Sequence, residues 1–268
     1  MKFGLKVEDL EKRGYTIFNE ILSKEEVACL KNELQAIELR AVDYSENQLV
    51  AHNVHWGLLP NLHKLIGQPI IISFLNRLFG DTLICTSTLY SQSRPGHPGI
   101  LLHTDAQPYG SKIFGMQASS PVLVRVLYYL DDLTPLKSPF RVIPFSHLSL
   151  HADANPYTRY KSHPDEVTIA CKAGTAVVIN QKVFHGNGPN TSKKSRSMLA
   201  VAYRPAWAGP IQEVEDWPPD KVNLLPEEIR PMFASLNTRK INYDLENRPK
   251  ALRSSAPGLN INRWKYQN

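Results

Sequence analysis

The amino-acid sequence predicts a mainly β domain, an antiparallel sandwich or jelly roll, with supporting helices in its N-terminal part. From Thr82 onwards, short runs of β-branched and aromatic residues are separated by Pro, Gly, Asn and Ser, with no helical pattern between them. Before Thr82, apolar side chains instead recur at the spacing of amphipathic helices. A chain of 268 residues has room for one such domain and an extension.

Residues 1–80 are therefore expected to be mostly helical support. Ser23 and Glu26 fit a capping box, in which each side chain accepts a hydrogen bond from the other residue's backbone N–H. The helix after this box has one apolar stripe, formed by Val27, Leu30, Leu34 and Ile37. A second helix has the stripe Ile71, Phe74, Leu75 and Leu78, and Gly80 is expected to end it.

Seven strands are expected in the jelly-roll core, which we assign to residues 82–205 of a domain that covers residues 1–205. They span residues 82–90, 100–105, 123–130, 140–143, 167–169, 176–180 and 195–203. Residues 206–268 form a proline-rich, basic extension that is expected to pack on the same domain. A short helix is expected near 226–235, with Pro226 in its first turn.

The charge and the cysteines limit the classes of partner and compartment. Residues 221–268 hold nine basic and four acidic residues, and so carry five of the six net positive charges. A solvated or subunit-packing tail explains this better than a nucleic-acid interface, so association of copies through the extension stays open. No stretch approaches the roughly 20 apolar residues of a membrane span, and no signal or transit peptide is expected. Three separated cysteines (Cys29, Cys85 and Cys171) fit a reducing compartment, and we expect a cytoplasmic location.

His-x-Asp tripeptides are the first candidates for a metal site. An oxygen-activating Fe(II) centre needs two histidines and one carboxylate, with coordination positions left open. Residues i and i+2 of a strand point to the same side, so His-x-Asp on a strand provides two ligands. The sequence has three such tripeptides, at residues 103–105, 151–153 and 163–165. The first follows the apolar run 100–102, whereas the others lie in a polar stretch with turn signals, so His103 and Asp105 are preferred.

His185 is the candidate third ligand, because it ends an apolar run and precedes a tight turn. A single histidine of this kind is more often structural. Arg196 changes that balance: it starts the last expected strand, eleven residues after His185, and its guanidinium suits a distal carboxylate. The combination favours an Fe(II) enzyme that uses 2-oxoglutarate. The alternative is a non-catalytic, cupin-like metal-binding or ligand-binding protein, which would have no need of Arg196.

The sequence resembles the phytanoyl-CoA dioxygenase family, within the Fe(II)/2-oxoglutarate oxygenase superfamily, over most of residues 8–205. The matching segments are residues 10–15, 22–27, 103–105, 129–132, 142–147, 185–187 and Arg196. The sequence departs from the family pattern in two places. Phe145 stands where the family usually has Gly, and Lys137-Ser138-Pro139 replaces its usual Asn-Gly turn.

The resemblance implies a double-stranded β-helix (a cupin-like jelly roll) and a dioxygenase that uses Fe(II), 2-oxoglutarate and O2. It implies that His103, Asp105 and His185 bind iron, that Arg196 binds the far carboxylate of 2-oxoglutarate, and that Asn187 helps to hold it. Related halogenases lack the carboxylate ligand. Because Asp105 fills that position, hydroxylation of a small metabolite, for instance in secondary metabolism, is expected. Succinate and CO2 are the accompanying products, and phytanoyl-CoA itself is not implied.

Six further residues are weaker candidates for binding the cosubstrate or the substrate. Gln92 lies on or just after the strand that precedes His103 and Asp105, and it is a candidate for cosubstrate binding. Arg125 and Tyr129 share one face of an expected strand and are candidates for substrate binding if that face is interior. By resemblance, the segment with His52, His55 and Trp56 lies near the site entrance, although a surface loop without a role explains it about equally well.

Overall fold

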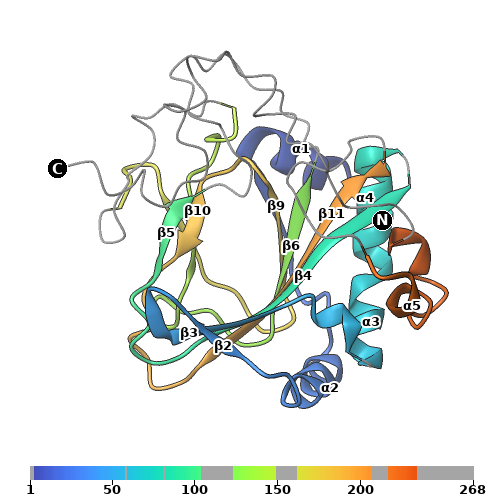
Figure 1. Ribbon diagram of the computed structural model, residues 1–268. Helices are drawn as coiled ribbons and strands as arrows, with labels where there is room; N and C mark the ends of the chain where they lie inside the picture. The colour runs from blue at the N-terminus through green and yellow to red at the C-terminus, as the bar shows by residue number, and fades with distance from the viewer. Residues whose placement is uncertain are drawn as a thin grey trace, which may run out of the picture.

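The computed structural model describes residues 3–57, 59–80, 82–103, 123–148, 162–206 and 217–233. Two antiparallel sheets face each other (Figure 1). The larger has the strand order β1-β9-β6-β11-β4-β3-β2, and the smaller has the order β5-β10-β7-β8. The predicted mainly β, jelly-roll architecture is confirmed.

The seven expected strands are all present. The large sheet consists of β1 (Tyr15–Phe18), β9 (Ala176–Asn180), β6 (Val124–Tyr129), β11 (Arg196–Pro205), β4 (Leu83–Ser93), β3 (Ser45–His52) and β2 (Arg40–Val42). The small sheet consists of β5 (Ile100–His103), β10 (His185–Asn187), β7 (Phe140–Val142) and β8 (Val167–Ile169). Three strands that were not expected, β1, β2 and β3, lie before Thr82 and widen the large sheet. A fourth unexpected strand, β10 in the small sheet, contains His185.

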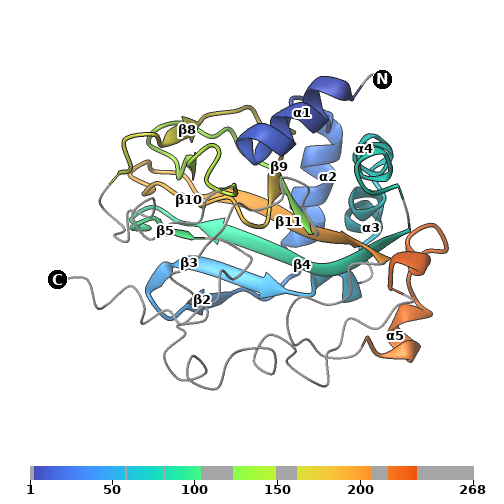
Figure 2. The same cartoon turned by 90° about the horizontal axis from the view of Figure 1, so that it is seen from above.

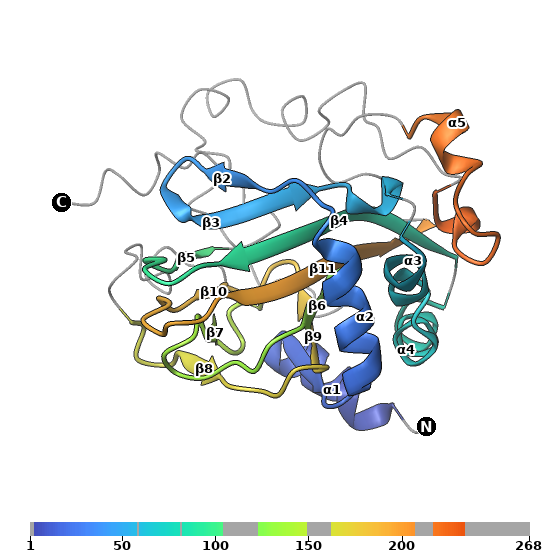
Figure 3. The same cartoon turned by 90° about the horizontal axis from the view of Figure 1, so that it is seen from below.

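The helices lie together on one side of the large sheet, and the small sheet lies on the other (Figures 2 and 3). They are α1 (Gly4–Arg13), α2 (Lys24–Leu34), η1 (Val54–Trp56), α3 (Pro60–Ile66) and α4 (Pro69–Phe79). The capping box is present: Ser23 Oγ accepts from the Glu26 N–H at 3.1 Å, and Glu26 Oε2 accepts from the Ser23 N–H at 2.7 Å. Gly80 ends α4 with a φ of 63°, as expected.

Alternation along each strand divides the core into two parts. Leu199, Val201 and Tyr203 of β11 pack into a helix-side core, whereas Met198 and Ala200 pack into an inter-sheet core. Arg196 precedes Met198 by two residues and therefore points between the sheets. The sheet thus separates a face that packs on helices from a face that lines the barrel interior.

The described part of the C-terminal extension packs against the helix-side core. It contains α5 (Pro219–Val222) and the 3-10 helix η4 (Arg230–Phe233). Trp217, Ile229 and Phe233 are buried there with residues of α3 and α4. The helix expected near 226–235 is a turn followed by η4, so it is shorter than predicted. Within the described ranges, no helix is long and apolar enough to cross a bilayer.

Candidate metal and cosubstrate site

His103 and His185 lie directly opposite each other on neighbouring strands of the small sheet. β5 and β10 are antiparallel, and the register pairs these two residues. Their ring centroids are 4.5 Å apart. His185 Nδ1 is 3.0 Å from the Val183 carbonyl. Since a carbonyl only accepts, Nδ1 donates its proton there, and Nε2 keeps the lone pair that a metal needs.

The position of Asp105 lies outside the described residues, which omit 104–122. In the ranges that the structure describes, no three His, Cys, Asp or Glu side chains form a group that could hold a metal. The second tripeptide, at 151–153, also lies outside these ranges. In the third, His163 and Asp165 lie in a turn before β8, and the Asp165 side chain is 81% exposed. This agrees with their interpretation as loop residues.

Arg196 has a fully buried guanidinium, with 0% exposure. Its Nη2 donates to Ser93 Oγ at 2.9 Å and, with the Asn187 amide oxygen turned towards it, to Asn187 at 2.7 Å. Nε and Nη1 make no hydrogen bond to any described residue. Burial lowers the pKa of Arg196, yet arginine stays charged in proteins. A buried cation that has no ion-pair partner among the described residues needs an anion, and a carboxylate fits the guanidinium fork.

Gln48, which the sequence reasoning missed, belongs to the same hydrogen-bonded group. Ser93 Oγ donates to Gln48 Oε1 at 2.6 Å, and Gln48 Nε2 donates to Ser91 Oγ at 3.3 Å. Gln92 lies between these serines on β4, so it points to the opposite face, where Tyr90 packs into the helix-side core. The structure therefore corrects the expectation for Gln92, because strand alternation takes its side chain away from Arg196.

Tyr129 contacts Arg196 from the neighbouring strand, β6. The Arg196 guanidinium lies 5.9 Å from the centroid of the Tyr129 ring. The Tyr129 hydroxyl is buried without a hydrogen-bond partner among the described residues, and burial raises its pKa. The face that Arg125 and Tyr129 were expected to share is the interior one, because Leu127 and Tyr129 belong to the inter-sheet core. Arg125 is half-buried there, opposite Ala202.

His52, His55 and Trp56, the residues of the predicted entrance segment, do not lie on the same face of the large sheet. His52 ends β3 opposite Leu89, on the interior face of the sheet, and is exposed. His55 and Trp56 lie in η1, on the helix-side face. The His55 ring is completely buried, with centroid distances of 5.1 Å to Trp217 and 4.8 Å to Phe233. The entrance assignment is therefore wrong for His55 and Trp56, because aromatic packing places them on the side of the sheet away from Arg196.

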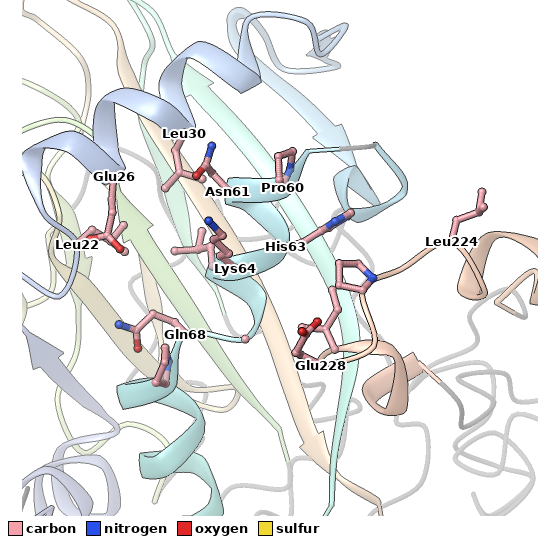
Figure 4. A pocket seen from close by; sticks show the side chains of 15 residues that line it. Leu22, Glu26, Leu30, Pro60, Asn61, His63, Lys64, Gln68, Leu224 and Glu228 are labelled. Carbon is pink, nitrogen blue, oxygen red and sulfur yellow. The ribbon is translucent and has the colours of Figure 1, made fainter.

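A cleft of about 820 Å³ lies between α2, α3 and the C-terminal extension (Figure 4). Leu30, Asn61, Lys64 and Glu228 are among its lining residues. None of the candidate metal or cosubstrate residues that the structure describes lines it. The cleft is thus a feature of the helix-side face, separate from the barrel interior.

The fold and the described residues define a jelly-roll protein whose interior has a histidine pair and a buried arginine. The sequence profile of the phytanoyl-CoA dioxygenase family (PhyH) matches residues 10–198, and the chain belongs to that family. It is accordingly an oxidoreductase of the 2-oxoglutarate-dependent dioxygenase class, and its cofactors are Fe(II) and 2-oxoglutarate. Family membership also decides against the non-catalytic alternative.

Curated relatives are distant in sequence. An uncharacterized protein of Mycobacterium tuberculosis is 21% identical over 202 residues, which cover 71% of this chain and 70% of the relative. The dioxygenase olcK of Penicillium canescens is 29% identical over 117 residues, 44% of this chain and 37% of its own. The L-proline trans-4-hydroxylase of Streptomyces griseoviridis is 28% identical over 110 residues, 31% of this chain and 41% of its own.

Solved structures share the fold. HygX from Streptomyces hygroscopicus, crystallised with nickel and 2-oxoglutarate, superposes with a TM-score of 0.65 at 14% identity, covering 82% of this chain and 94% of HygX. SnoK, a carbocyclase of nogalamycin biosynthesis, superposes with a TM-score of 0.60 at 21% identity, covering 76% of this chain and 84% of SnoK.

Proposed function

We propose that the protein hydroxylates a small-molecule metabolite and converts 2-oxoglutarate to succinate and CO2 in the same cycle. The observation that carries this proposal is the link between the histidine pair and the buried arginine. His185 and Asn187 are two residues apart on β10 and share a side of the strand, and Asn187 accepts a hydrogen bond from Arg196. The candidate metal ligand and the carboxylate anchor are therefore neighbours in the barrel interior.

Each residue has a distinct role in this proposal. His103, Asp105 and His185 hold Fe(II), and Arg196 with Asn187 holds the far carboxylate of 2-oxoglutarate. Bound Fe(II) supplies the activation of O2 that oxidises both the cosubstrate and the substrate. The hydrogen bond of His185 to the Val183 carbonyl keeps Nε2 directed at the metal. Tyr129 and the apolar residues of the inter-sheet core keep water away from the Arg196 anchor.

The substrate side of the interior is assigned to Arg125 and His52. Both lie on the interior face of the large sheet; Arg125 is half-buried and His52 is exposed. The named relatives support a small organic substrate, since one is a proline hydroxylase and a HygX structure contains hygromycin B. Asp105 favours hydroxylation over halogenation. Secondary metabolism, a cytoplasmic location and association through residues 206–268 remain predictions.

The test compares two His-x-Asp carboxylates. Under anaerobic conditions, Fe(II) and 2-oxoglutarate should give the weak visible charge-transfer band of a chelated complex, and candidate metabolites should then stimulate succinate release. Asp105→Ala should lose iron binding and succinate production. Asp165→Ala, at an exposed carboxylate in the turn before β8, should keep both. Unchanged succinate production by Asp105→Ala would reject the assignment.

A further inference from the structure

We propose that Gln48 is a positioning residue for the cosubstrate anchor, acting on Arg196 through the Ser93 hydroxyl. This inference rests on the proposed function, because it assigns Arg196 to the carboxylate of 2-oxoglutarate. Gln48 lies on β3, a strand that is far from Arg196 in the sequence. β4 joins the two, since Ser93 pairs with Gln48 on one side and with Arg196 on the other.

The three side chains form a buried, directional chain of hydrogen bonds. Gln48 is 2% exposed, and Ser93 and Arg196 are 0% exposed. Ser93 Oγ is 2.6 Å from Gln48 Oε1 and 2.9 Å from Arg196 Nη2. An amide oxygen can only accept and a guanidinium can only donate, so the serine proton points to Gln48 and its lone pairs point to Arg196.

Gln48 itself is held in the orientation that this arrangement needs. Its Nε2 donates to Ser91 Oγ at 3.3 Å, on the same face of β4. The amide therefore presents its oxygen to Ser93. Without that acceptor, the Ser93 proton would lack a partner or would turn towards the guanidinium, which already carries positive charge. Either result would disturb the position of Arg196.

The neutral charge of Gln48 also matters for binding. A carboxylate at this position would be separated from the guanidinium by a single hydroxyl oxygen. In a buried region it would supply the anion that Arg196 otherwise obtains from the cosubstrate. The chain would then satisfy its own cation, and 2-oxoglutarate would have to compete with an internal ion pair.

Gln92 provides a matched control, because it lies on β4 next to Ser93 but points to the opposite face. The experiment compares Gln48→Glu and Gln48→Met with Gln92→Glu and Gln92→Met. Four quantities are measured: the melting temperature without cosubstrate, the increase in melting temperature at saturating 2-oxoglutarate, and the anaerobic dissociation constants for Fe(II) and for 2-oxoglutarate.

Gln48→Glu should raise the dissociation constant for 2-oxoglutarate by about 30-fold, and Gln48→Met by roughly 5-fold, with Fe(II) affinity unchanged. Gln48→Glu should also raise the melting temperature without cosubstrate while reducing the increase that 2-oxoglutarate produces. A purely structural role would lower the melting temperature and leave the ligand response intact. The Gln92 variants should bind both ligands as the wild type does.

Two results would overturn the inference. One is wild-type affinity for 2-oxoglutarate in both Gln48 variants, and the other is an equal loss of affinity in the Gln92 variants. If Gln48→Glu does not fold, the 2-oxoglutarate affinities of Gln48→Met and Gln92→Met decide: wild-type affinity in Gln48→Met, or an equal loss in both, overturns the inference. A wild-type protein that binds no 2-oxoglutarate would overturn the proposed function, and this inference with it, which separates the two failures.

Discussion

His55 and Arg196 are two nitrogen-containing side chains buried on opposite faces of the same sheet. Both have 0% exposure, and both contact β4: His55 through Thr88 and Arg196 through Ser93. Burial, with the nearby His63 as a second cause, lowers the pKa of His55 to about 3, so this ring is neutral in the folded protein. Arginine cannot respond in that way, because its guanidinium stays charged.

The two side chains differ in the charge that they bury. On the helix side, aromatic rings surround a neutral histidine, whose Nε2 also lacks a hydrogen-bond partner among the described residues but carries no charge. In the interior, a charged group keeps unused N–H donors that no described residue satisfies. Aromatic packing accounts for the buried neutral ring of His55. The buried charge of Arg196 instead calls for an anionic ligand. The proposed cosubstrate provides that anion.

The largest effect is expected when the interior charge of Arg196 is removed. Arg196→Met should raise the dissociation constant for 2-oxoglutarate about 100-fold, since losing one partner of a buried, hydrogen-bonded charge pair costs about 3 kcal/mol. Anaerobic calorimetry with Fe(II) present measures the change.

Arg204 offers a control on the same strand. It is also buried, but its Nη1 donates to the backbone carbonyls of Pro205 and Ala206. It is eight residues from Arg196, roughly 27 Å along β11. Arg204→Met should leave the affinity for 2-oxoglutarate unchanged in protein that folds. Equal losses in the two variants would show a general effect of removing arginine from β11.

The next largest effect concerns the neutral histidine. The folded-state pKa of His55, about 3, lies below its unfolded value of about 6.5. The stability from this site is therefore present above pH 6.5 and is lost as the pH falls towards 3, because the unfolded chain takes up the proton first. Between pH 7 and pH 5 the loss should be about 2 kcal/mol of unfolding free energy.

His55→Phe should remove that part of the acid sensitivity while keeping an aromatic ring in the cluster. Denaturant unfolding at both pH values, followed by tryptophan fluorescence, measures the difference. The wild type and the variant share every other titratable group, so the comparison isolates His55. Equal losses of stability in both proteins would mean that this ring is not held neutral.

The sequence was sufficient where local pattern decides structure. β-branched and aromatic runs predicted the core strands. Strand geometry selected His103, and the end of an apolar run before a tight turn selected His185; the structure pairs the two directly. β3 was missed because its first half, Ser45 to Gln48, consists of polar residues with little strand preference. Pairing with β4 makes it a strand, which is a tertiary effect. Gln48 was missed with it.

The wrong position of His55 has the same origin. Its neighbours Trp217 and Phe233 come from the C-terminal extension, at the other end of the described chain, and no local pattern indicates that packing. The prediction for Gln92 was wrong about which face of the strand its side chain occupies. The strand was predicted, but only the contacts of Ser93 show which face of β4 meets Arg196.

The smallest effect concerns Phe145, an unusual residue outside the interior. Phe145 has a φ of 67° and is 56% exposed, and its N–H donates to the Arg13 carbonyl. A left-handed conformation strains any residue with a Cβ, which gives a physical reason for the glycine that the family usually has there. Phe145→Gly should stabilise the fold by about 1 kcal/mol, whereas Phe145→Ala keeps the strain and should not. Denaturant unfolding ranks the three proteins, and equal stability of the Gly and Ala variants would refute the strain.

The same variant tests whether features outside the interior also serve cosubstrate binding. Because Phe145 does not contact Arg196 through any described hydrogen bond, the affinity of Phe145→Gly for 2-oxoglutarate should not change. Anaerobic calorimetry with Fe(II) measures it beside the wild type. Weaker binding in that variant would mean that the surface loop after β7 is coupled to the buried charge of Arg196. Cosubstrate binding would then depend on more than the interior face of the sheet.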